Sequence, residues 1–150
     1  MIDAISLLKD DHKKVKALLA ELADTTNRAE KTRPELLARI AKEIKVHSII
    51  EEEIFYPAFR QAGEKSDDGK MFFEAMEEHR AAGDLVLPDL LGTDVKSDQF
   101  SGRAKVLKEL IEHHADEEEK EMFPRARELM DKAQLQELGE RMAQRKAELM

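Results

Sequence analysis

An internal repeat constrains this chain more than any other feature of its sequence. A shift of 67 residues, the separation of His12 from His79, places similar residues on one another along much of the chain. The matched pairs are His12 with His79, His47 with His114, Glu51 with Glu118, Glu52 with Glu119, Ile44 with Ile111, and Phe55-Tyr56-Pro57 with Met122-Phe123-Pro124. We therefore interpret the chain as two related helix pairs. Each pair carries a histidine on one helix and a His-x-x-x-Glu motif followed by an aromatic residue and a proline on the other.

Start and stop signals divide the chain into helical segments. We predict helices over about 3–24, 32–61, 70–91, 97–130 and 132–149. The predicted N-terminal signals are Asp3, Thr32 with Pro34, Ser97 or Asp98, and a capping box from Asp131 to Gln134. No segment alternates as a strand does. The sequence thus predicts an all-α fold, an up-down-up-down four-helix bundle over about 3–130 with a short C-terminal fifth helix, in one domain over 1–150.

Each predicted long helix has an apolar stripe, and polar residues interrupt it. In the first helix the stripe includes Leu8, His12 and Val15, spaced by three and four residues. Residues with this spacing share the face of a helix that packs on the core. The polar residues on the four stripes are His12, His47, Glu51, His79, His114 and Glu118. We expect these six side chains to point into the protein interior.

Composition excludes several classes of function. The chain has 150 residues and a formal net charge of −8, so it offers no basic face for nucleic acid. It has no cysteine, which excludes disulfides, zinc–thiolate sites and thiol nucleophiles. The start, MIDAISLLKDDHKK, lacks the basic and apolar regions of a signal peptide, and no segment resembles a membrane span. We expect a soluble, cytoplasmic protein.

The six interior residues have the chemistry of a metal site. Residues four apart on a helix lie about 6 Å apart at Cβ, so one ion could contact His47 and Glu51, and a second His114 and Glu118. His12 and His79 would each add a nitrogen from a neighbouring helix. Buried carboxylates need a compensating positive charge, which two divalent ions would supply. Imidazole and carboxylate ligands suit iron, with manganese or zinc as alternatives.

These residues resemble the hemerythrin family in its HHE cation-binding branch. The resemblance covers nearly the whole chain through His12, His47-x-x-x-Glu51, His79 and His114-x-x-x-Glu118, with the phrases EEEIFYP and EEEKEMFP. It implies a non-haem di-iron centre in which the two glutamates and an oxo or hydroxo group bridge the irons. It further implies that His12 and His47 bind one iron and that His79 and His114 bind the other.

The sequence differs from the family's oxygen carriers in two ways. The carriers have a His-x-x-x-His pair on the third helix, whereas this chain has Ala75 and Gly83 four residues before and after His79. They also place an aspartate five residues after the last histidine, where this chain has Glu118 four residues after His114. The resemblance therefore implies more open metal positions and favours a sensor or handler over a reversible oxygen store.

Several neighbouring residues have alternative interpretations. His113 is four residues before Glu117 but lies about 100° from the apolar stripe, so it is either solvated, supporting the ligands, or an extra ligand. We interpret Tyr56 as a packing residue, with a redox or supporting role as the alternative. The glutamates that flank the two predicted ligands (Glu52, Glu53, Glu117 and Glu119) are interpreted as surface charges. We expect Pro57 and Pro124 to end or kink their helices, and Pro88 to do the same.

Three functions follow as hypotheses. The first is a non-haem di-iron protein that binds or senses oxygen, peroxide, nitric oxide or iron. The alternative is a di-iron enzyme that decomposes peroxide or reduces nitric oxide, and the third is a metal-free helical adaptor. The expected partner is a small diatomic or peroxide ligand. The chain is expected to be a monomer or a homodimer, with the C-terminal helix either padding the bundle or mediating dimerisation.

Overall fold

A computed structural model describes residues 2–64 and 68–150 of the chain. Within these residues every regular element is helical, which confirms the predicted all-α class. The helices are α1 (Ala4–Ala23), α2 (Thr32–Ile50), α3 (Tyr56–Ala62), α4 (Gly69–His79), α5 (Leu87–Leu91), α6 (Asp98–Glu117), α7 (Phe123–Leu129) and α8 (Lys132–Leu149). None of the described helices is both long and apolar enough to cross a membrane.

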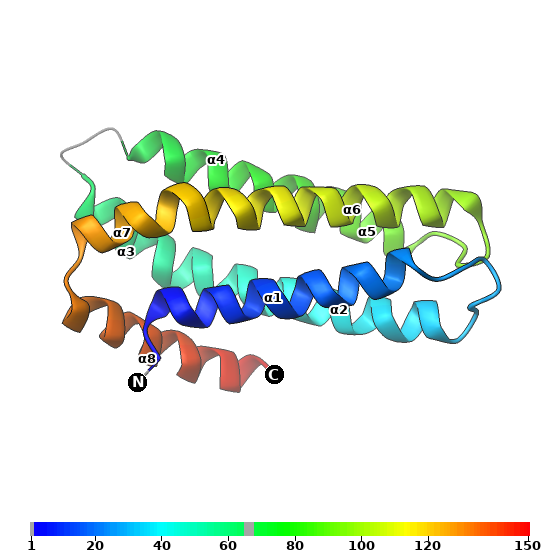
Figure 1. The fold of residues 1–150 in the computed structure, drawn as a ribbon, viewed down its shortest axis with the longest axis horizontal. Helices are drawn as coiled ribbons and strands as arrows, with labels where there is room; N and C mark the ends of the chain where they lie inside the picture. The colour runs from blue at the N-terminus through cyan, green and yellow to red at the C-terminus, as the bar shows by residue number, and fades with distance from the viewer. Residues whose placement is uncertain (1, 65–67) are drawn as a thin grey trace.

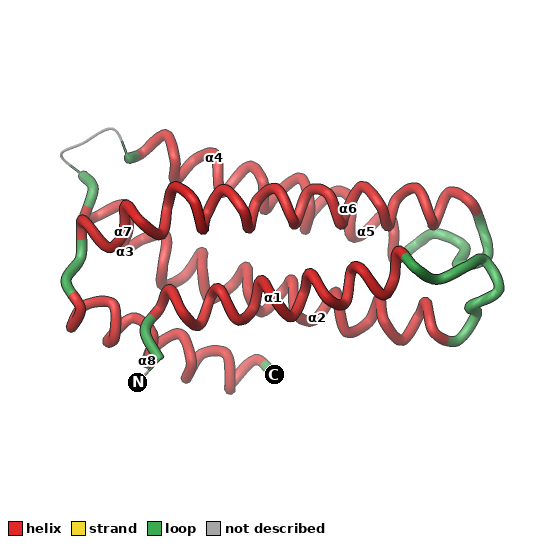
Figure 2. The backbone as a smooth tube through the Cα atoms, viewed as in Figure 1, coloured by secondary structure: helices red, strands yellow, loops and turns green. Residues whose placement is uncertain are grey.

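Three π-helical turns join shorter helices into long continuous stretches. They are η1 (Glu51–Phe55) between α2 and α3, η2 (Arg80–Val86) between α4 and α5, and η3 (Glu118–Met122) between α6 and α7. With α1, these stretches run along the longest axis of the molecule, while α8 lies beside the first half of α1 (Figure 1). Loops connect the stretches at the two ends (Figure 2).

The prolines explain the π-helical turns. In each of the three stretches a proline is the second residue after the turn: Pro57, Pro88 and Pro124. A proline has no N–H and its ring clashes with the carbonyl four residues earlier. A π-helical turn shifts the hydrogen bonding by one residue, as in the bond from the Tyr56 N–H to the Glu51 carbonyl. The helices therefore continue beyond these prolines. Of the two alternatives for Pro57 and Pro124, an end of the helix was wrong, whereas a local distortion of the helix is present just before each proline.

Side-chain caps fix most of the predicted helix starts. Asp3 accepts a hydrogen bond from the Ser6 N–H, and Ser97, rather than Asp98, caps α6. The capping box from Asp131 to Gln134 is also confirmed. Helix α2 begins at Thr32, as predicted, but Thr32 is its first residue and not its cap. The residue in the cap position is Lys31, which has a helical backbone and makes no side-chain cap bond.

The apolar core is divided into two clusters. One lies toward α3, α7 and α8 and includes Phe55, Phe59 and Phe123. The other includes Leu22, Ile40, Phe100 and Leu107. Along α1 the first cluster ends at Leu8 and the second begins at Val15, with His12 between them. The polar residues of the predicted stripes thus occupy a layer between two apolar clusters.

Helix α8 covers α1, α2 and η1, in agreement with the padding interpretation of the C-terminal segment. Gly139 makes this close approach feasible, because a Cβ added there would lie only 2.6 Å from the carbonyl carbon of Asp3. Lys146, further along α8, forms an ion pair with the buried Asp11 of α1.

Candidate metal centre

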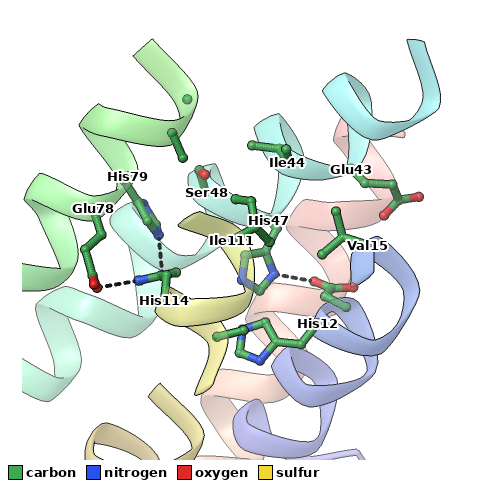
Figure 3. A pocket seen from close by; sticks show the side chains of 14 residues that line it. His12, Val15, Glu43, Ile44, His47, Ser48, Glu78, His79, Ile111 and His114 are labelled. Atoms are coloured by element: carbon green, nitrogen blue, oxygen red, sulfur yellow. Dashed lines mark hydrogen bonds and ion pairs between the residues drawn. The ribbon is translucent and has the colours of Figure 1, made fainter. Parts of the chain in front are cut away.

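The structure brings all six predicted site residues together. Candidate ligand atoms of His12, His47, Glu51 and Glu118 lie within 4.8 Å of one another, and so do those of Glu51, His79 and His114. Glu51 belongs to both groups. Its Oε1 is 3.0 Å from the Nε2 atoms of His47 and His79, while Oε1 of Glu118 is 3.0 Å from Nε2 of His12. In the close-up, the four imidazole rings converge on the space between the helices (Figure 3).

Two atoms of this cluster show that its chemistry fits a cation. Among the described residues, Glu51 Oε2 and His47 Nε2 are buried and make no hydrogen bond, although His47 Nε2 lies within ion-pair distance, 3.0 Å, of Glu51 Oε1. Leaving polar atoms in this state costs about 1–3 kcal/mol each, and more when a group is charged. A divalent cation would give both atoms a partner. The donor set of imidazole nitrogens and carboxylate oxygens suits iron, manganese or zinc.

A carboxylate orients each of the four histidines through its outer nitrogen. The Nδ1–O distances are 2.9 Å for His12 to Glu119, 2.9 Å for His47 to Asp11, 3.0 Å for His79 to Glu52 and 2.8 Å for His114 to Glu78. Such hydrogen bonds fix the ring orientation and, in the neutral ring, leave the Nε2 lone pair directed at a metal. Glu52 and Glu119 do reach the surface, as interpreted, but each also orients a histidine of the centre, which the interpretation as surface charges missed.

These orienting carboxylates obey the same repeat as the candidate ligands. Asp11 corresponds to Glu78, and Glu52 corresponds to Glu119. Each carboxylate contacts a histidine on a neighbouring helix: His12 of the first helix pair uses Glu119 of the second, and His79 of the second uses Glu52 of the first. The repeat thus includes the carboxylates around the candidate ligands as well as the ligands themselves.

The cluster binds protons strongly when no cation is present. Burial lowers the pKa of His47, but the carboxylates of Glu51 and Asp11 outweigh it and raise this pKa to about 10. Burial raises the pKa of Asp11, but hydrogen bonds from His47 and Lys146 leave it below its usual value. For Glu51, the opposing effect of burial is outweighed by His47 and its other imidazole neighbours, which hold its pKa well below the usual range. A cation that binds here would replace the proton of His47.

Tyr56 lies at the centre, in agreement with the supporting role given as the alternative to packing. Its hydroxyl donates to Glu118 Oε2 at 2.7 Å and lies 3.2 Å from Glu51 Oε1. The same oxygen lies 3.1 Å from His79 Nε2 and 3.3 Å from His114 Nε2. Burial, followed by the negative charges of Glu118 and Glu51, raises the Tyr56 pKa well above its usual value. The hydroxyl therefore holds a proton between the two candidate ligand groups.

The π-helical turn η1 brings Tyr56 to the centre. In a regular α-helix, a residue five positions after Glu51 would lie about 140° away around the axis. The i+5 hydrogen bonding of η1 instead places Tyr56 on the same side as Glu51. Phe123 occupies the matching position after η3 and stacks on His12, with ring centroids 5.7 Å apart. At this position the two halves of the centre therefore differ by one hydroxyl group.

His113 lies outside the two buried groups. Its side chain is 65% exposed, and its Nε2 is 3.1 Å from Glu117 Oε1 and 3.6 Å from Glu78 Oε2. Glu78 is the residue that orients His114, so His113 reaches the centre only through this carboxylate. The geometry agrees with the interpretation of His113 as a solvated residue.

Comparisons with known proteins agree with this geometry. The model of the family described as Hemerythrin HHE cation binding domain matches residues 3–126. The uncharacterized protein Rv2633c of Mycobacterium tuberculosis and its counterpart in Mycobacterium bovis are each 30% identical over 145 residues, covering 96% of this chain and 85% of theirs. The crystal structure of a hemerythrin HHE cation binding domain-containing protein, the Rv2633c homolog from Mycobacterium kansasii, superposes with a TM-score of 0.85. It is 31% identical, and the match covers 99% of this chain and 88% of that one. This chain therefore belongs to the hemerythrin HHE cation-binding domain family.

Proposed function

We propose that this protein binds two iron ions at the centre and uses them to bind or sense oxygen, peroxide or nitric oxide. The observation that carries the proposal is the pair of buried donor groups that share Glu51, in which a carboxylate orients every histidine. We also propose that the long helical stretches form an up-down-up-down four-helix bundle, with α8 as its fifth helix, in one domain.

The donor groups assign residues to each ion. His12 and His47, with Glu118, would hold one iron, and His79 and His114 would hold the other. Glu51 would lie between them. Four neutral imidazoles and two carboxylates carry a charge of about −2, which two divalent cations more than balance. Iron bound here would supply reversible electron transfer and an open position for a small ligand.

The cavity beside the histidines supports a very small ligand. It has a volume of about 30 Å³ and is lined by all four of these histidines together with apolar residues such as Val15 and Ile111. A cavity needs about 10–15 Å³ on this scale to hold one water. Oxygen, nitric oxide and peroxide are of this size, whereas an organic substrate is larger than the cavity.

Iron stoichiometry tests the proposal. Protein loaded without oxygen and freed of loosely bound metal should contain about two irons per chain, with the Mössbauer signature of a coupled pair. His114→Ala should reduce the iron content, whereas His113→Ala, one position away and exposed, should leave it unchanged. Fewer than one iron per chain in the unaltered protein would refute the di-iron proposal.

Tyr56 supports a second function, in which the centre turns over peroxide or nitric oxide. Reduction of nitric oxide consumes protons, and decomposition of peroxide transfers protons between its oxygens. The Tyr56 hydroxyl holds a proton at hydrogen-bond distance from Glu51 and Glu118. A binding or sensing protein would consume about one equivalent of peroxide per centre, whereas an enzyme would consume many. If the centre is an enzyme, Tyr56→Phe should slow turnover without changing the iron content.

A further inference from the structure

The cavity at the centre meets a larger groove on the surface. The groove has a volume of about 580 Å³ and lies between α2 on one side and α4, η2 and α5 on the other. Four residues line both the cavity and the groove: Ile44, Ser48, His79 and Gly83. The groove therefore borders the cavity along these residues and reaches one of the histidines, His79.

Two of the shared residues have little or no side chain. Gly83 lies on η2, and a Cβ added to it would have no neighbour within 4 Å, so the space beside it is open. Ser48, on α2, also lines both spaces, and in the view of Figure 3 it lies between Ile44 and His79. The border shared by the cavity and the groove thus includes a glycine and a serine.

The internal repeat supplies a comparison within the same molecule. The positions that match Gly83 and Ser48 are Lys16 and Ala115. Lys16 on α1 donates to Asp116 on α6 at 2.8 Å, and this ion pair lies across the interface between the two helices. On one side of the centre, Lys16 thus carries a long side chain that bridges two helices. On the other side, the matching residue Gly83 has no side chain.

The border of the groove carries both signs of charge. Lys45 and Arg80 line it together with acidic residues such as Glu77 and Asp84. A border of mixed charge gives little preference for cations or anions. The small volume of the cavity, about 30 Å³, would instead select ligands by size.

We propose that the opening between Ser48 and Gly83 is the route by which a small ligand enters the centre from solvent. The identity of the ligand rests on the proposed function, but the route itself does not. Because neither Ser48 nor Gly83 is a candidate ligand, filling the opening should slow entry without altering the candidate ligands.

Tyr56 provides a test that needs no metal. It is the only tyrosine of a chain without tryptophan, so tyrosine emission reports from the centre alone. The rate constant for quenching of this emission by dissolved oxygen should fall by at least about threefold in Gly83→Phe. The matched control is Gly102→Phe, on the exposed part of α6, where an added Cβ also has no neighbour within 4 Å. In this control, the rate constant for quenching of tyrosine emission by oxygen should equal that of the unaltered protein.

Ser48→Leu fills the opposite wall and provides a second, independent variant. Circular dichroism would show that each variant retains its helices. Equal quenching rate constants in a folded Gly83→Phe or Ser48→Leu variant and in the unaltered protein would overturn the proposal. Because this measurement uses metal-free protein, it can succeed or fail independently of the di-iron proposal.

Azide binding to iron-loaded protein gives a second readout. A change in an entry route raises the barrier equally in both directions. The association and dissociation rate constants should therefore fall together in Gly83→Phe, by about tenfold, with the dissociation constant unchanged. A changed dissociation constant at unchanged association rate would show that Gly83 shapes the binding position rather than the route, and would also overturn the proposal.

Discussion

Replacing Tyr56 with phenylalanine isolates one hydroxyl at the centre. Phenylalanine fits this kind of position, because Phe123 occupies the matching place in the second half of the repeat. In metal-free protein, the hydroxyl donates to Glu118 at 2.7 Å and contacts Glu51 at 3.2 Å, and both carboxylates are buried. Hydrogen bonds to charged groups contribute about 1.5–3 kcal/mol. We expect Tyr56→Phe to lower the free energy of unfolding by about 2–3 kcal/mol, since Glu118 Oε2 would lose a buried donor.

Urea unfolding followed by circular dichroism measures this effect. For a chain of this size, a loss of about 2 kcal/mol corresponds to a fall of about 1 M in the midpoint. The loss should be smaller after cation loading, because a cation would then neutralise the carboxylate oxygens. In a double-mutant cycle, Tyr56→Phe should cost much less when Glu118 is already Gln. A loss below about 0.5 kcal/mol in chelator, which is the size of an ordinary surface substitution, would refute the reasoning.

Three further predictions concern cations, pH and packing. A divalent cation at about 1,000 times its dissociation constant should stabilise the fold by about 4 kcal/mol and raise the melting temperature by about 10 °C in calorimetry. An unchanged melting temperature would contradict a cation site that is specific to the folded state. In chelator, the pKa of His47 is about 10 in the folded protein, against 6.5 for an ordinary histidine. Its contribution to stability is therefore complete below pH 6.5 and is lost as the pH rises toward 10. The urea midpoint should fall over this range, more steeply than in His47→Gln, and parallel curves would contradict the assignment. Gly139→Ala should cost about 1–3 kcal/mol in urea unfolding, because the new Cβ would lie 2.6 Å from backbone atoms at the start of α1. Gly102→Ala, where space is open, should be neutral or stabilising, and equal effects of the two would show that α8 does not pack as described.

The sequence was sufficient to place six polar side chains in one interior layer. His12, His47 and Glu51 lie on helical stripes of apolar residues, and such stripes face the core whatever the details of packing. The repeat then assigned the matching residues His79, His114 and Glu118. Periodicity and repetition act along the chain, so these features could be read from a single sequence.

The partners of the histidines could not be read in this way. Each of these partners is the immediate sequence neighbour of a candidate ligand, yet each contacts a histidine on a different helix. They are Asp11, Glu52, Glu78 and Glu119. In an isolated helix these residues point away from the stripe and resemble surface charges. Which histidine each one meets depends on how the helices are rotated and aligned against their neighbours.

Tyr56 and Gly83 depended most on the tertiary structure. Helical periodicity of 3.6 residues turns Tyr56 away from Glu51, and only the π-helical turn before Pro57 restores it to the centre. The role of Gly83 became clear only by comparison with Lys16 at the matching position. The Lys16 side chain bridges two helices, whereas the space beside Gly83 is open. The sequence by itself determined which residues face the interior, because that follows from local periodicity. The tertiary structure decided which of them touch and where the centre is open, because those properties depend on contacts between helices.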